Sequence, residues 1–181
     1  MFYDLLRSRR SVRKFQDRDV EKGKTDAILK SALLSPSSRA GRPWEFVAVT
    51  DRELLKRLSG CREHGSGFLA GAPLGIVVLA DPAACDVWVE DASIASIIIQ
   101  LAAQSLGLSS CWIQVRKRFH PGGGTAGEYI RGVLGIPPEY RVACMIAIGY
   151  PAEQTRAQDD AELLYDKVHF NRYCPEPSPP E

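Results

Sequence analysis

The stretch DVWVEDASIASIIIQLAAQSL, residues 86–106, decides the architecture expected of this chain. Its apolar residues occur on nearly every side of a helix instead of forming one stripe, and Asp86 is suited to cap the start. A helix of this composition belongs in the middle of a core or at an interface between subunits. Gly107 is expected to end it. The rest of the fold should therefore be arranged around this central helix.

Short apolar segments on both sides of the helix are expected to be strands, because they are rich in β-branched and aromatic residues and bounded by glycine and proline. The predicted strands are 44–49, 74–80, 109–115 and 142–148. Further helices are predicted from Asp19 up to Pro36, from Asp51 through Leu58, and from about Thr125 to Leu134. These elements do not follow a strict βαβ repeat. The predicted fold class is α+β, an α/β sandwich with a small mixed central sheet surrounded by helices.

Length and composition favour one globular domain, since 181 residues with 45% hydrophobic and 25% charged side chains can bury a core. We expect this domain to span residues 1–174. Residues 159–174 are polar with scattered apolar anchors, which is typical of an arm that exchanges across to a partner subunit. The segment 175–181, PEPSPPE, is of low complexity and is expected to be disordered.

Charge and cysteine content exclude several classes of protein. The formal net charge is +1, from 23 basic and 22 acidic residues, so no large field of one sign would hold nucleic acid. Five cysteines, with no CxxC pair, suit neither a disulfide framework nor a zinc site. Three histidines far apart in sequence give no metal-ligand spacing. These features favour a cytoplasmic protein without a metal.

No segment has the pattern of a membrane anchor or a secretory signal. The chain begins MFYDLLRSRR, which lacks a long apolar run and a small-residue cleavage site. The apolar stretch 93–108 is interrupted by Gln100 and Gln104 and is shorter than a membrane span requires. We therefore expect no membrane partner.

The segment RSRRSVRKF, residues 7–15, places five cations and two hydroxyls within nine residues. Guanidinium groups donate paired, charge-assisted hydrogen bonds to phosphate oxygens, and serine adds a compact donor. The segment therefore predicts a site for a phosphate-bearing ligand. By itself it is more typical of a solvated basic surface or a nucleic-acid patch.

A second segment, PSSRAGRPWEF at residues 36–46, joins the end of a predicted helix to a predicted strand. Its two serines supply hydroxyls after a proline, and backbone N–H groups can line the turn. Such a loop can hold the polar edge of a ligand. Alone, it is more typical of an ordinary connection.

Four motifs together resemble the nitroreductase family. They are RRSVRKF, then PSS-x4-PW, then GLSSCWI after the long helix, then AIGYP, and they extend in this order from Arg9 to Pro151. The resemblance implies FMN as cofactor, a homodimer with the flavin at the subunit interface, NADH or NADPH as electron donor, and a ping-pong reaction with a small oxidant such as a nitroaromatic or quinone. No side chain then needs to act as catalytic acid or base, because N5 of the flavin carries the chemistry.

The same resemblance assigns the site residues. The FMN phosphate and ribityl chain would be held by Arg9, Arg10, Ser11 and Arg13, with Arg156 as a further phosphate contact. Pro36, Ser37 and Ser38 would reach the flavin from the partner subunit. The segment containing Ile113 and Gln114 would pass the reactive edge of the ring, with a backbone N–H near Gln114 bonded to N5. Cys111 lies near this segment, but no histidine or aspartate partner is visible for it, so a small buried hydrophobic role is favoured.

The chain departs from the family pattern at Ala40 and Arg42, where the family usually carries asparagine and glutamine. Arg42 could contact the ribityl chain or favour an anionic substrate. The alternatives left open are therefore a specialised flavin enzyme acting on an anionic metabolite, a dehalogenase or flavin-consuming relative, and a flavin-binding or storage protein without turnover.

Overall fold

A four-stranded sheet forms the centre of the structure, a computed structural model that describes residues 1–174. The strands are β1 (Trp44–Val49), β2 (Leu74–Ala80), β3 (Ser109–Gln114) and β4 (Arg141–Gly149), in the order β1-β2-β4-β3. All four predicted strands are confirmed, and so is the α+β class. The sheet is not mixed: each pair of neighbouring strands is antiparallel, and parallel pairing occurs as an isolated bridge between Ser11 and Ser110.

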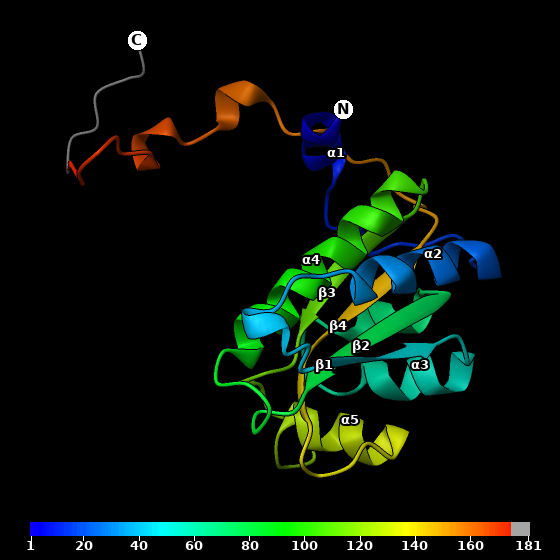
Figure 1. The fold of residues 1–181 in the computed structure, drawn as a ribbon. Helices are drawn as coiled ribbons and strands as arrows, with labels where there is room; N and C mark the ends of the chain where they lie inside the picture. Colours follow the sequence, from blue (N-terminus) through cyan, green and yellow to red (C-terminus); the bar gives the residue numbers. More distant parts are fainter. Residues whose placement is uncertain (175–181) are drawn as a thin grey trace.

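Five α-helices accompany the sheet (Figure 1). They are α1 (Phe2–Ser8), α2 (Lys22–Leu33), α3 (Arg52–Ser59), α4 (Trp88–Ser105) and α5 (Ala126–Leu134). The expected start of α2 at Asp19 is wrong, because the Asp19 carboxylate accepts a hydrogen bond from Arg52 at 2.7 Å and the helix begins after Glu21. Asp51 caps α3 as predicted, accepting from the N–H of Leu54 at 2.8 Å.

The core lies on both faces of the sheet. On one face, Ile28 of α2 and Ile99 of α4 pack against Ile76 and Ile146. On the other face, α3, α5 and the segment around Leu69 cover the same two central strands. Strands β2 and β4 are therefore buried on both sides, which explains their almost continuous apolar sequences.

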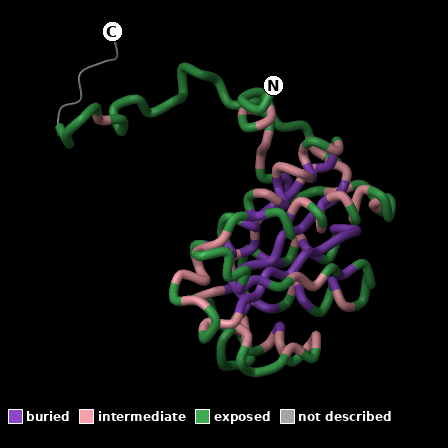
Figure 2. The backbone as a smooth tube through the Cα atoms, in the orientation of Figure 1, coloured by how far each residue is buried: buried purple, intermediate pink, exposed green. Residues whose placement is uncertain are grey.

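The chain beyond β4 runs past α1 and then away from the sheet (Figure 1). Its first part is fastened to α1: the Tyr3 hydroxyl donates to Asp160 at 2.7 Å, and Arg7 pairs with the same carboxylate at 3.2 Å. From there to residue 174 the backbone is almost entirely exposed (Figure 2). The predicted disorder of 175–181 lies outside the described residues. Within residues 1–174 no helix is both long and apolar enough to cross a bilayer.

Candidate functional site

A cavity of about 580 Å³ brings together five of the residues expected to hold a phosphate. It is lined by Arg9, Arg10, Ser11 and Arg13 from the segment after α1, and by Arg156 from the chain after β4. The N-terminal segment is held at this place by β3, because the N–H of Val12 donates to the carbonyl of Ser110 at 3.1 Å. The segment after α1 and the segment after β4, which are far apart in sequence, thus form one cationic cavity.

Glu153 fixes the backbone of the arginine segment and was not identified from the sequence. Its Oε1 accepts from the N–H groups of Arg13 at 2.7 Å and Lys14 at 3.3 Å. These bonds lower the pKa of the Glu153 carboxyl below its usual value. With Val12 buried beneath it, the segment directs the side chains of Ser11 and Arg13 outward, as the alternation of an extended strand requires.

Glu162 brings a negative charge into the same cavity. It lines the cavity and forms an ion pair with Arg156, the cation that was expected to touch a phosphate. The carboxylate therefore occupies the position toward which Arg156 would attract an anion.

Replacing Glu162 by glutamine is expected to strengthen binding of a phosphate-bearing ligand, because Arg156 is released and one repulsive charge is removed. The pair is largely exposed, so the gain should be modest, about three-fold in Kd. Titration of the apoprotein with FMN measures it. Glu162→Asp, which keeps the charge, serves as the control. Weaker FMN binding by Glu162→Gln would contradict the view that Glu162 competes with the phosphate for Arg156.

The loop between α2 and β1 is held in an unusual conformation. Arg39, Ala40 and Arg42 all have positive φ, at 51°, 54° and 47°, although none is glycine. Such conformations cost free energy and are retained where surrounding contacts impose them. One of these contacts is internal: the Ser37 hydroxyl accepts from the N–H of Arg42 at 2.9 Å.

Asp91, at the start of α4, supplies the other contact. Its Oδ1 accepts a hydrogen bond from the N–H of Ser38 at 2.9 Å, and Asp91 is only 3% exposed. From the sequence alone, the expected role of Asp91 is to complement the dipole at the start of the helix. A buried carboxylate bound to a loop N–H instead indicates a residue that positions the Ser37–Ser38 turn.

Asp91→Ala is expected to loosen this turn, because the N–H of Ser38 loses its buried acceptor at a cost of about 1–3 kcal/mol. The free energy of unfolding in urea should fall by that amount, and the affinity for FMN should fall with it. Asp91→Asn keeps an acceptor oxygen and should retain most of both. Equal losses of stability and FMN affinity in the two variants would mean that the negative charge of Asp91, and not its hydrogen bond to Ser38, holds the turn.

The loop and the arginine cavity do not meet within one chain. Both touch α4, but at opposite ends: Ser38 bonds Asp91, whereas the Ser8 hydroxyl accepts from Gln104 at 3.3 Å. These two helix positions are separated by ~20 Å at a rise of 1.5 Å per residue. The loop 36–42 also does not line the cavity. Within one chain the two regions therefore contact opposite ends of α4.

The edge strand β3 offers backbone groups to a ligand. The N–H of Val115 donates to Ala143 on β4, so in the antiparallel ladder the N–H of Gln114 points away from β4, toward the open edge of the sheet. The guanidinium of Arg62 donates to the Gln114 carbonyl at 2.9 Å and fixes this peptide from the same side. Ile113 differs, because its side chain is wholly buried in the core and its backbone faces β4.

Cys111 lies beneath the arginine segment and is 2% exposed. Burial raises the pKa of its thiol, which disfavours a reactive thiolate. Its role as a small buried side chain fits this environment.

A sequence model described as "Nitroreductase family" matches residues 6–61 and 59–150 of the chain. A candidate NADH dehydrogenase/NAD(P)H nitroreductase of Archaeoglobus fulgidus is 34% identical over 174 residues, covering 93% of this chain and 97% of that protein. A protein of Methanothermobacter thermautotrophicus with the same description is 35% identical over 173 residues, covering 94% and 86%. Among solved structures, an FMN-dependent nitroreductase of Clostridium difficile R20291 superimposes with a TM-score of 0.92 at 52% identity, covering 94% of this chain and 99% of that one.

Proposed function

Because the chain belongs to the nitroreductase family and is therefore an oxidoreductase, we propose that it binds FMN at the interface of a homodimer and passes electrons from NADH or NADPH to a small oxidant. The observation that carries this proposal is the cavity lined by Arg9, Arg10, Ser11, Arg13 and Arg156.

The chemistry of that cavity fits a phosphate monoester. Four guanidinium groups and a hydroxyl supply hydrogen-bond donors, and the guanidiniums can offer paired, charge-assisted contacts to phosphate oxygens. Glu162 is the acidic group that lines it, and it is already paired. A dianionic phosphate would satisfy these donors better than a neutral ligand could.

A second copy of the chain is needed to complete the site in this proposal. The loop 36–42 would approach the flavin from the partner, since within one chain it is held far from the arginines. Apolar side chains without a partner in one chain support this arrangement: Ile94 and Ile97 on α4 are each 38% exposed, and Leu34 is 83% exposed. The exposed arm 159–174, with Leu164 and Phe170 uncovered, would pack across the partner.

The residues of this chain would bind and orient the reactants, and no side chain would act as acid or base. When bound, FMN supplies a hydride acceptor at N5. The N–H of Gln114 would donate to that atom from the edge of β3, with Arg62 holding its peptide in place. Arg13 and Lys14 would place positive charge near the pyrimidine end of the ring, which would favour its uptake of electrons. The electron donor, NADH or NADPH, and the oxidant would bind in the same pocket one after the other.

Arg42 supports a second candidate function, an enzyme specialised for an anionic metabolite. Its side chain is exposed at the tip of the loop, and no ion pair of Arg42 occurs among residues 1–174. Comparing wild type with Arg42→Gln on acidic and neutral oxidants tests this candidate. A loss of kcat/KM confined to acidic oxidants would support it, and equal values would remove it.

The proposed reaction is tested by adding NADH or NADPH to the purified, FMN-loaded protein without oxygen. The visible flavin absorbance should disappear, and it should return on addition of a quinone or nitroaromatic compound. A flavin-loaded protein whose absorbance is unchanged by both coenzymes would contradict the oxidation-reduction cycle, and a protein that takes up no FMN would contradict the site itself.

A further inference from the structure

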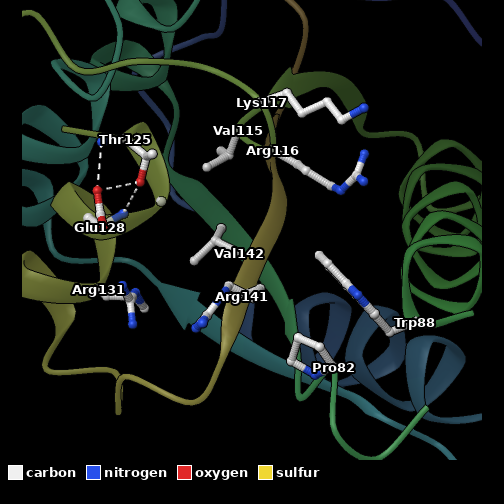
Figure 3. A pocket seen from close by; sticks show the side chains of 11 residues that line it. Pro82, Trp88, Val115, Arg116, Lys117, Thr125, Glu128, Arg131, Arg141 and Val142 are labelled. Atoms are coloured by element: carbon white, nitrogen blue, oxygen red, sulfur yellow. Dashed lines mark hydrogen bonds between the residues drawn. The ribbon is translucent and has the colours of Figure 1, made fainter. Parts of the chain in front are cut away.

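A second cavity, of about 460 Å³, opens beyond the end of β3 between α4, α5 and the start of β4 (Figure 3). It begins directly after Gln114, since Val115 and Arg116 both line it. It shares no lining residue with the cavity formed by Arg9, Arg10 and the other N-terminal cations. It is therefore a separate place for a ligand, next along the chain from the proposed flavin contact.

Four cations line this cavity: Arg116, Lys117, Arg131 and Arg141. None of them forms an ion pair with a carboxylate in the part of the chain that the structure describes. Arg131 and Arg141 instead both donate to one neutral acceptor, the carbonyl of Pro138. Two guanidinium groups are thus held close together. Both interact electrostatically with Glu128, but neither forms an ion pair with it, so a bound anion would further stabilise the arrangement.

The carboxylate that lines the cavity, Glu128, is already engaged. It accepts from the N–H of Thr125 at 2.7 Å and from the hydroxyl of the same residue at 2.8 Å, completing the cap of α5. These hydrogen bonds lower the pKa of the Glu128 carboxyl, so the group stays ionised while directed at the helix start. Against the four cations it leaves an excess of positive charge in the cavity.

Trp88 gives the cavity an aromatic wall. In Figure 3 its indole and the Arg116 side chain project into the same space, with Arg131 and Arg141 across from them. The Arg116 guanidinium carbon lies 5.8 Å from the centre of the indole ring. An aromatic face beside clustered guanidiniums suits a ligand that has both a planar ring and a phosphate.

We propose that this cavity binds the phosphorylated end of a nucleotide, with the phosphate among the four cations and the base against Trp88. Two sources share this chemistry: the adenosine 2′-phosphate of NADPH, and a free mononucleotide. The choice of NADPH rests on the proposed function, because a coenzyme reacting beside Gln114 must place its adenosine end elsewhere on the protein. In that case the cavity makes the enzyme prefer NADPH to NADH.

The binding claim is tested by calorimetric titration of the FMN-saturated protein with adenosine 2′,5′-bisphosphate. Arg116→Gln should weaken binding about ten-fold, as expected for loss of one charge-assisted contact to phosphate. Arg116→Lys should keep part of the affinity. Arg118→Gln is the matched control, because Arg118 is an exposed arginine of the same segment that does not line the cavity. No binding by the wild type, or equal affinity in Arg116→Gln and Arg118→Gln, would overturn the proposal.

The source of the phosphate is identified from steady-state kinetics of the same variants. A rise in KM for NADPH but not NADH in Arg116→Gln would identify the coenzyme. Unchanged KM values with weakened bisphosphate binding would identify a free nucleotide. Failure of the proposed function would appear differently, as absence of flavin reduction by either coenzyme, whereas the calorimetric comparison of Arg116 with Arg118 does not depend on turnover.

Discussion

Replacing Arg10 by glutamine is expected to weaken FMN binding by about ten- to a hundred-fold. Arg10 is half-buried, lines the N-terminal cavity and has no acidic partner in the described chain, so its charge is available to a phosphate. Hydrogen bonds to charged groups contribute about 1.5–3 kcal/mol, which corresponds to that range of Kd. Fluorescence titration of the apoprotein with FMN measures the change.

Arg57→Gln is the matched control for this prediction. Arg57 is an exposed arginine on α3 that lines neither cavity, so the same change of charge there should leave the Kd for FMN within about two-fold. If both variants lost affinity equally, the net charge of the protein would explain the effect and the cavity would not. An unchanged Kd in Arg10→Gln would remove Arg10 from the site.

Gly149→Ala is expected to destabilise the fold by about 1–3 kcal/mol, because the added methyl group has no room. A Cβ at this position would lie 2.6 Å from Cδ of Pro73 and 3.0 Å from the Phe15 ring. The proline ring cannot rotate away, so backbone must shift. Phe15 ends the arginine segment and is bridged to Pro151, so the shift should also reduce FMN occupancy. Urea unfolding followed by circular dichroism gives the free energy of unfolding.

Gly132→Ala provides a control for which no loss of stability is expected. Gly132 lies within α5, and apart from its chain neighbours and the backbone of its own helix no atom lies within 4 Å of the position its Cβ would take. Alanine is favoured over glycine inside a helix by up to about 1 kcal/mol, so this variant should be at least as stable as the wild type. A Gly149→Ala protein as stable as Gly132→Ala would show that the contact with Pro73 is relieved at no cost.

The strands could be predicted from the sequence because each is a short β-branched or aromatic run between breakers. The start of α2 could not, because Asp19 has the right chemistry for a cap and its use depends on Arg52, which is distant in sequence. Helix α1 was not predicted. None of its residues, Phe2–Ser8, is buried, so its sequence lacks the apolar face that marks a helix packed on a core.

Residues of the proposed site could be chosen from the sequence where one segment carries the chemistry, but not where two distant segments cooperate. Arg9 to Arg13 are adjacent in sequence, so their charge is visible directly. Asp91 and Arg62 act on backbone groups of the Ser38 turn and of Gln114, far away in the chain, and no local pattern indicates such bonds. The cations around Trp88 come from three separate segments and are likewise seen only in the folded chain.

The central claim is that each flavin lies between the arginines of one chain and the serine loop of another. It is tested most directly by mixing two defective variants, Arg10→Gln and Ser38→Tyr, under conditions that exchange subunits. A dimer formed from one of each has one site with both parts intact and one with both parts altered. The account predicts that FMN, which each variant alone binds weakly, is bound with wild-type affinity at one site of each mixed dimer. A mixture that exchanges subunits and regains no site of wild-type affinity would show that both parts of the site belong to the same chain.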